Sequence, residues 1–200
     1  MPLTFRSIRR DDVPLIGMVT RLTYQKGLEL VQQVVPAMIG QGRIAMAVLG
    51  SGETRYEQFF HWLQQSFPGR VCFWRGYNNR LSHWIEAGSD LFLMPSVFEP
   101  CGLNQMYSLR YGTPPIVRRT GGLADSVQLF HPETGTGNGI VFNDYDAAAL
   151  RWAIDYGLQL FQNKRSWRKL MQNGMAQDHS WERQGALYVD LYRRLLRHSG

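Results

Sequence analysis

Two cations, Arg21 and Lys26, flank a turn between a short apolar run and a helical pattern. A cation pair at the N-terminus of a helix suits a diphosphate, because the side-chain charges and the free backbone amides act together there. Spacing alone is equally compatible with two exposed surface cations. The turn is therefore a candidate phosphate site.

A carboxylate occupies a second turn of the same kind, residues 95–103. Glu99 stands between Phe98 and Pro100, shortly after the apolar run 91–94. A carboxylate just past the end of a strand suits the recognition of sugar hydroxyls. The alternative is that Glu99 caps the helix predicted to begin at Asn104, through the helix dipole.

Two adjacent glycines, Gly121 and Gly122, mark a third turn, within residues 118–125. Glycine lets the backbone approach a ligand closely, and neighbouring amides can form a nest for an anion. The alternative is an ordinary turn. Together, the three turns offer cations, a carboxylate and backbone donors, which are the groups that a nucleotide sugar requires.

The elements that must position these turns alternate between strand-like and helix-like patterns. Strands are predicted at 15–19, 44–49, 71–74, 91–94, 115–117 and 140–142. Helices are predicted at 28–40, 53–66, 81–87, 104–111, 146–161 and 181–197. This alternation indicates an α/β fold with a doubly wound, Rossmann-like parallel sheet. Ligands of such sheets bind beyond the carboxyl ends of the strands, so we expect the three turns to converge on one crevice.

The turns also carry a family resemblance. Residues 21–27, 98–105 and 118–125 closely resemble the signatures of bacterial glycogen synthases and plant starch synthases, and Gly76-Tyr77 and residues 180–183 match as well. The resemblance runs from about Pro14 to Leu195. It implies one half of a two-domain, retaining GT-B glucosyltransferase. The implied reaction moves glucose from ADP-glucose to the non-reducing end of an α-1,4-glucan.

The resemblance also implies roles for single residues. Arg21 and Lys26 are expected on the donor pyrophosphate and Glu99 on the hydroxyls of the transferred glucose. The implied nucleotide-sugar-binding residues are Tyr77, Cys101, Gly102, Leu103, Thr120, Gly121 and Gly122. Tyr77 is expected to stack on the adenine, because a flat ring recognises the face of a base. No metal or other cofactor is implied.

One position favours a narrower assignment among the retaining transferases of this architecture. Many retaining transferases of this architecture carry a second glutamate after seven intervening residues, and Tyr107 occupies that position here. Synthases of the bacterial type also lack that glutamate. Tyr107 therefore favours them over relatives of the sucrose or trehalose-phosphate synthases. UDP-glucose stays open as an alternative donor.

The resemblance extends to domain organisation. Residues 1–12 are predicted to be a linker or domain boundary, and residues 13–200 a C-terminal nucleotide-sugar-binding domain whose final helix, 181–197, reaches toward an N-terminal domain. The Lys-x-Gly-Gly-Leu loop of that N-terminal domain is absent from the sequence. Expected partners are ADP-glucose or ADP, the α-1,4-glucan acceptor and the missing N-terminal domain. The alternative is a domain that binds nucleotide without turnover.

Composition argues against other classes of protein. The net charge is +6, but Lys and Arg are scattered and densest near the two ends, which does not favour a nucleic-acid partner. No apolar run reaches the roughly 20 residues that span a bilayer, so no membrane partner is expected. We expect a cytoplasmic location, or a plastid one in a plant. A β-sandwich glucan-binding module would need an all-β pattern, which is absent.

Two patterns in the sequence contain residue types that bind metals, but neither predicts a metal site. The two cysteines, Cys72 and Cys101, fit neither a disulfide framework nor a metal site. Asp144 and Asp146 form an Asp-x-Asp pattern, but they precede a predicted helix. We therefore interpret one of these aspartates as a helix N-cap.

Overall fold

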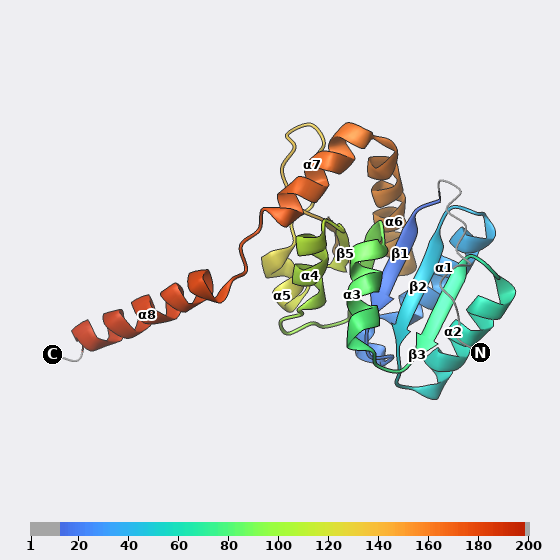
Figure 1. Cartoon of the computed structure of the whole chain (residues 1–200), viewed down its shortest axis with the longest axis horizontal. Helices are drawn as coiled ribbons and strands as arrows, with labels where there is room; N and C mark the ends of the chain where they lie inside the picture. The colour runs from blue at the N-terminus through green and yellow to red at the C-terminus, as the bar shows by residue number, and fades with distance from the viewer. Residues whose placement is uncertain (1–12, 199–200) are drawn as a thin grey trace.

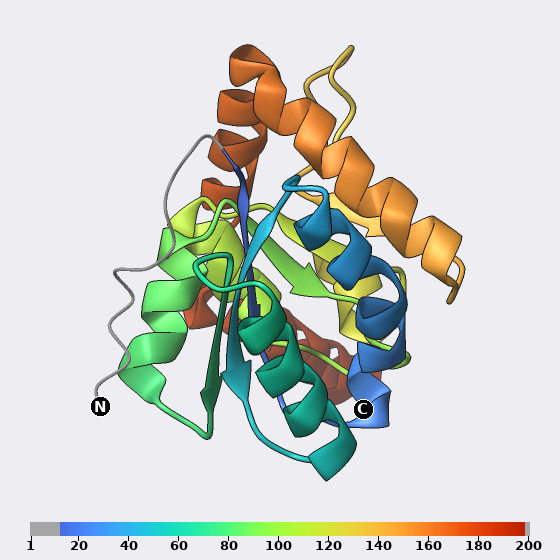
Figure 2. The same cartoon turned by 90° about the vertical axis from the view of Figure 1, so that its right-hand side faces the viewer.

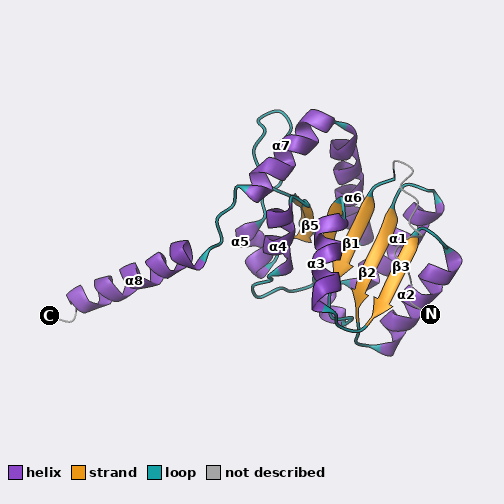
Figure 3. Cartoon of the chain, viewed as in Figure 1, coloured by secondary structure: helices purple, strands orange, loops and turns teal. Residues whose placement is uncertain are grey.

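The structure, a computed structural model, describes residues 13–198, so the predicted linker at 1–12 lies outside the described residues. Within this range six parallel strands form one sheet in the order β3-β2-β1-β4-β5-β6. Figure 3 shows β1, β2 and β3 side by side in this sheet. The strands are β1 (Leu15–Val19), β2 (Ala45–Gly50), β3 (Val71–Arg75), β4 (Leu91–Met94), β5 (Pro115–Arg118) and β6 (Ile140–Phe142). All six predicted strands are confirmed. The strand order reverses between β1 and β4, which is where doubly wound sheets bind ligands.

Helices cover both faces of this sheet. They are α1 (Leu28–Gly40), α2 (Thr54–Ser66), α3 (Asn79–Gly88), α4 (Asn104–Tyr111), α5 (Gly121–Ser126), α6 (Ala147–Gln162), α7 (Lys164–Met175) and α8 (Trp181–His198), with a short 3-10 turn, η2 (Tyr24–Lys26). Figure 2 shows α3 on one side of the sheet and α1 and α2 on the other. Helix α6 shares the core of α1 and α2, whereas α4 and α5 contact strands on the α3 side. The predicted doubly wound fold is confirmed.

The alternation of side chains along β1 shows how the two cores arise. Ile16 and Met18 are buried in the main core with α1, α2 and α6. Leu15 and Val19 pack instead against the smaller core that includes Ile85 of α3. Successive side chains of a strand point to opposite faces. A strand buried on both faces therefore has a continuous apolar run in its sequence, which is the pattern that predicts it.

Helix α7 is absent from the sequence-based prediction. Its N-cap residue, Asn163, accepts a hydrogen bond from the Ser166 amide at 3.1 Å. The helix buries Trp167 and Leu170, and it packs against α6 and α4. Its few apolar residues keep a helical spacing, but they stand among many polar ones, so the segment lacks the apolar content that marks the other helices in the sequence. The short elements α5 and η2 are absent from that prediction as well.

Helix α8 projects away from the rest of the molecule (Figure 1). The spacing of its apolar residues predicts a helix, and the structure confirms it. These side chains are exposed: Trp181, Leu187, Tyr188, Val189, Leu191, Tyr192, Leu195 and Leu196. No helix within residues 13–198 is long and apolar enough to cross a membrane. The apolar side of α8 is therefore open to contact with another protein segment.

Candidate active site

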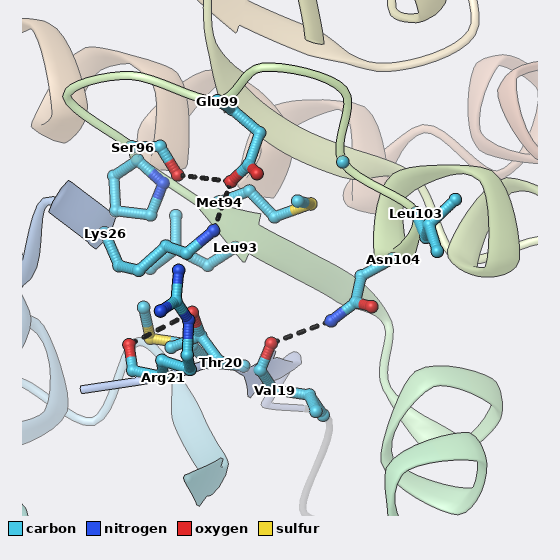
Figure 4. A pocket seen from close by; sticks show the side chains of 13 residues that line it. Val19, Thr20, Arg21, Lys26, Leu93, Met94, Ser96, Glu99, Leu103 and Asn104 are labelled. Carbon is cyan, nitrogen blue, oxygen red and sulfur yellow. Dashed lines mark hydrogen bonds and ion pairs between the residues drawn. The ribbon is translucent and has the colours of Figure 1, made fainter. Parts of the chain in front are cut away.

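A cavity of about 170 Å³ lies at the point where the strand order reverses. The ends of β1 and β4 form its floor, and the loop after β4 forms one wall (Figure 4). The lining residues are Met18, Val19, Thr20, Arg21, Lys26, Leu93, Met94, Pro95, Ser96, Glu99, Gly102, Leu103 and Asn104. Five of the predicted site residues are among them: Arg21, Lys26, Glu99, Gly102 and Leu103.

Lys26 and Glu99 form an ion pair in this cavity. The Nζ atom of Lys26 lies 2.5 Å from Oε2 of Glu99, and the two side chains are only 16% and 9% exposed. Ser96 Oγ donates a second hydrogen bond to the same oxygen at 3.2 Å (Figure 4). Glu99 is therefore not the cap of α4, whose N-cap position is Leu103. Lys26 is likewise not an exposed surface cation.

Arg21 also lines this cavity. The residue is exposed, and Figure 4 shows its guanidinium group pointing toward the side chain of Lys26. Two cations and one carboxylate thus share a small, partly enclosed space. Such a site has a net positive charge when all three groups are ionised, which favours an anionic ligand.

Gly27 explains how the turn after β1 reaches the loop after β4. Its φ angle is +69°, and a Cβ atom there would overlap the carbonyl oxygen of Pro95. Only glycine combines this left-handed conformation with such a close approach. Gly27 also lies between η2 and α1, so it places Lys26 immediately before the first turn of α1.

Gly121 and Gly122, the glycine pair of the third turn, pack against the backbone of the loop that carries Glu99. A Cβ atom at Gly121 would overlap the carbonyl oxygen of Glu99, and one at Gly122 would overlap that of Cys101. The Gly122 amide donates a hydrogen bond to the Glu99 carbonyl at 3.0 Å. This amide is therefore occupied within the protein, which corrects the expected anion nest at Gly122. Thr120, Gly121 and Gly122 support the cavity and are not among the residues that line it.

Two further predicted residues lie outside the cavity lining. Tyr77 follows β3 and is 83% exposed, with its hydroxyl donating to Oδ1 of Asn79 at 3.2 Å. Cys101 is exposed, and its thiol donates a long 3.5 Å contact to the Gly102 carbonyl. The structure therefore brings the charged residues together and leaves Tyr77 at a distance along the sheet edge.

Three polar residues of the site are not singled out by the sequence. Ser96 contacts Glu99 directly. Asn104 donates from Nδ2 to the Val19 carbonyl at 2.8 Å and so ties the start of α4 to the end of β1. Gln25 contacts the Glu99 loop from the turn after β1. Gln25 and Ser96 stand inside turns that the sequence marks as functional, and Asn104 directly follows one. Only the folded geometry distinguishes these residues from their neighbours.

The Asp-x-Asp pattern has a structural role. Asp146 is the N-cap of α6, and its Oδ1 accepts a hydrogen bond from the Ala149 amide at 2.7 Å. The N-cap interpretation is confirmed for this residue. Within residues 13–198, no group of three or more His, Cys, Asp or Glu side chains is placed to hold a metal ion.

Comparisons with known proteins show the family to which the chain belongs. The family described as Glycosyl transferases group 1 matches residues 3–174. A glycogen synthase from Bacillus cereus (strain Q1) is 45% identical over 187 residues, which cover 94% of this chain and 39% of that protein. A glycogen synthase from Anaeromyxobacter dehalogenans is 50% identical over 186 residues, which cover 93% and 39%. The chain thus spans about two fifths of the length of these curated relatives.

A solved structure extends the comparison to three dimensions. The catalytic domain of Starch Synthase IV from Arabidopsis thaliana, bound to ADP and acarbose, superimposes with a TM-score of 0.82 and 35% sequence identity. The match covers 91% of this chain and 38% of that one. Similarity in fold and in sequence therefore points to the same group of enzymes.

Proposed function

The chain belongs to the group 1 glycosyl transferases, and on that premise we propose that it is the donor-binding C-terminal half of a glycogen or starch synthase. The proposed reaction transfers glucose from ADP-glucose to the non-reducing end of an α-1,4-glucan. The observation that carries the proposal is the buried Lys26–Glu99 pair, beside Arg21, in a cavity at the reversal point of the sheet. The glycogen synthases that are 45–50% identical to this chain support the choice of reaction.

Arg21 and Lys26 are proposed to bind the diphosphate of the donor. As the bond to the anomeric carbon breaks, the departing nucleoside diphosphate gains negative charge. Fixed cations that face this charge stabilise the transition state more than the ground state. The two cations can supply the electrostatic stabilisation that a metal ion gives in other transferases, so we propose that the reaction needs no metal.

Glu99 is proposed to hold the glucose that is transferred. Its two hydrogen-bonded contacts within the described residues, from Lys26 and Ser96, both use Oε2. Oε1 is thereby left to accept a hydrogen bond from a sugar hydroxyl. A carboxylate that contacts the sugar also favours the positive charge that develops on it.

Tyr77 and the backbone around the cavity are proposed to complete the donor site. The exposed ring of Tyr77 can stack on the base. Residues 101–103, Thr120 and Gly121 are proposed to contact the sugar and the distal phosphate. The ADP in the Starch Synthase IV structure supports an adenine nucleotide, and UDP-glucose is the alternative donor.

The second half of the enzyme is proposed to be an N-terminal domain that closes the cavity and brings the glucan acceptor. The chain spans 39% of the Bacillus cereus relative, which leaves ample length for such a domain. The exposed apolar residues of α8 are proposed to contact it. The proposed location is the cytoplasm, because a charged nucleotide sugar does not cross a bilayer unaided.

A transfer assay tests the proposal. The chain is joined to the part of the Bacillus cereus glycogen synthase that it does not match, and incorporation of glucose into a glycogen primer is measured with ADP-glucose and with UDP-glucose. We expect transfer by the joined protein with ADP-glucose, and none by the chain alone. Efficient transfer by the chain alone would contradict the two-domain proposal. A joined protein that binds ADP-glucose without transfer would favour a binding function.

A further inference from the structure

The loop that carries Glu99 is held at three successive carbonyl groups. The carbonyl oxygens of residues 97, 98 and 99 accept hydrogen bonds from three separate donors. In the same order, the donors are Arg118 Nη1 at 3.4 Å, Gln25 Nε2 at 3.0 Å and the Gly122 amide at 3.0 Å. The turn after β1, the end of β5 and the start of α5 thus all anchor the loop that follows β4.

Gln25 is the anchor that joins the turn of Lys26 to the loop of Glu99. Its backbone carbonyl accepts a hydrogen bond from the Val97 amide at 2.9 Å, while its side-chain amide donates to the Phe98 carbonyl. Gln25 precedes Lys26, and Phe98 precedes Glu99. The two hydrogen bonds therefore close a small ring immediately beside the Lys26–Glu99 pair.

We propose that Gln25 is a positioning residue, whose side-chain amide fixes the Glu99 loop against the Lys26 turn so that Glu99 meets the glucose of a nucleotide sugar. The inference rests on the proposed function of the cavity and adds a residue that does not line it. Catalytic groups must be held to within a fraction of an ångström, and a small displacement of the supporting loop lowers their effectiveness strongly.

Of the three residues that donate hydrogen bonds to the loop, Gln25 is the one whose substitution should disturb the fold least. Arg118 also lies over the ring of Tyr145 at 5.6 Å, and its Nε atom is buried. Gly122 cannot accept a side chain without a clash. Gln25 is half-buried, and its side-chain contact is with a single backbone carbonyl. A substitution there removes one donor and leaves the core in place.

The test uses Gln25→Met, which keeps the length of the side chain but removes the donor. Gln177→Met is the matched control, because Gln177 Nε2 also donates to a backbone carbonyl, that of Asn173, at the end of α7. The affinities of the 200-residue chain for ADP and for ADP-glucose are measured by calorimetry. We expect Gln25→Met to lower the ratio of ADP-glucose to ADP affinity by roughly tenfold, with ADP affinity within about threefold of the original. Gln177→Met should change neither the affinity ratio nor the affinity for ADP.

A double variant separates positioning from a general structural effect. If Gln25 acts through Glu99, Gln25→Met in a Glu99→Gln background should lower the affinity ratio little further, because coupled residues are non-additive. A purely structural role would lower the melting temperature and leave the ratio alone. An unchanged ratio in Gln25→Met, or an equal loss for both ligands, would overturn the inference.

A ligand-free measurement keeps the inference distinct from the proposed function. Failure of the unaltered chain to bind either nucleotide would overturn the proposed function. In that case, hydrogen exchange of the Val97 amide, which donates to the Gln25 carbonyl, still reports on the loop. We expect faster exchange in Gln25→Met than in Gln177→Met. Equal exchange in the two variants would overturn the positioning role of Gln25.

Discussion

Lys26 and Glu99 are separated by 73 residues in the chain, yet their charged atoms lie 2.5 Å apart. Each belongs to a loop that follows a strand, and the two strands, β1 and β4, are neighbours in the sheet. The pair thus exists because the strand order reverses at this point. Both side chains are largely shielded from water, so each contributes to the stabilisation of the other.

Replacement of Lys26 should therefore destabilise the fold. Lys26→Met leaves a largely buried carboxylate with Ser96 as its remaining contact. We expect a decrease in the free energy of unfolding of about 3 kcal/mol, as is typical when one partner of a buried ion pair is lost. Lys169→Met, at an exposed position on α7, is the control and should change stability little. Urea denaturation measures both, and equal stabilities would refute the buried-pair account.

Replacement of Glu99 should separate nucleotide binding from sugar transfer. Glu99→Gln keeps the shape of the side chain and removes its charge. In the chain joined to the unmatched part of the Bacillus cereus enzyme, we expect turnover to fall by roughly a hundredfold, as for the loss of one electrostatic stabiliser. The affinity of the chain for ADP should stay within a few-fold. Intact turnover, or complete loss of ADP binding, would show that Glu99 has another role.

The close packing behind the Glu99 loop gives a third test. Gly122→Ala would place a methyl group on the Cys101 carbonyl, whereas Gly88, at the end of α3, has open space around it. We expect Gly122→Ala to destabilise the fold by about 2 kcal/mol or more, because neither backbone segment can move freely. Gly88→Ala should be neutral or slightly stabilising. Thermal unfolding compares the two variants, and similar melting temperatures would contradict the close packing at Gly122.

Glu86 makes stability depend on pH. This side chain of α3 is buried, and burial raises its pKa, while His83, whose Nδ1 lies 3.1 Å away, opposes the shift. The rings of Tyr107 and Tyr111 on α4 pack against His83. The folded state therefore binds the Glu86 proton more tightly than the unfolded state does. This contribution to stability is complete below the ordinary pKa of 4.5 and is lost as pH rises through the raised value.

Glu86→Gln tests that sign. The variant should be more stable than the original chain at a pH of about 8, and the difference should shrink as the pH falls toward about 4. Glu182→Gln, at an exposed position on α8, provides the control with the same change of charge. The free energy of unfolding is measured by urea across this range. A difference that grows as pH falls would mean that the pKa of Glu86 is shifted in the opposite direction.

The amino-acid sequence is sufficient to predict the sheet and the charged residues of the site. Strands buried on both faces are continuous apolar runs, and the turns after them must meet at one edge of a parallel sheet. The positions of Arg21 and Glu99 in such turns therefore predict that the two residues lie near each other. Roles that depend on ligand contact, such as stacking by Tyr77, remain predictions.

Other features cannot be predicted from the sequence, for physical reasons. Helix α7 has few apolar residues, and its packing against α4 and α6, which the sequence does not reveal, stabilises it. The Gly121-Gly122 pair is typical of an open anion nest, but the Gly122 amide bonds to the Glu99 carbonyl. The contact of Gln25 with residue 98 likewise joins segments that are distant in the chain.

The measurement that tests the account most directly is calorimetric titration of the chain with ADP, UDP and ADP-glucose. The account predicts one site that binds ADP and ADP-glucose, with UDP weaker. It also predicts that Arg21→Ala lowers ADP affinity by at least about tenfold, since charge-assisted contacts to phosphate are strong. Arg165→Ala, an exposed arginine on α7, should bind ADP as the original chain does. Absence of ADP binding, or equal binding by Arg21→Ala and Arg165→Ala, would contradict the account.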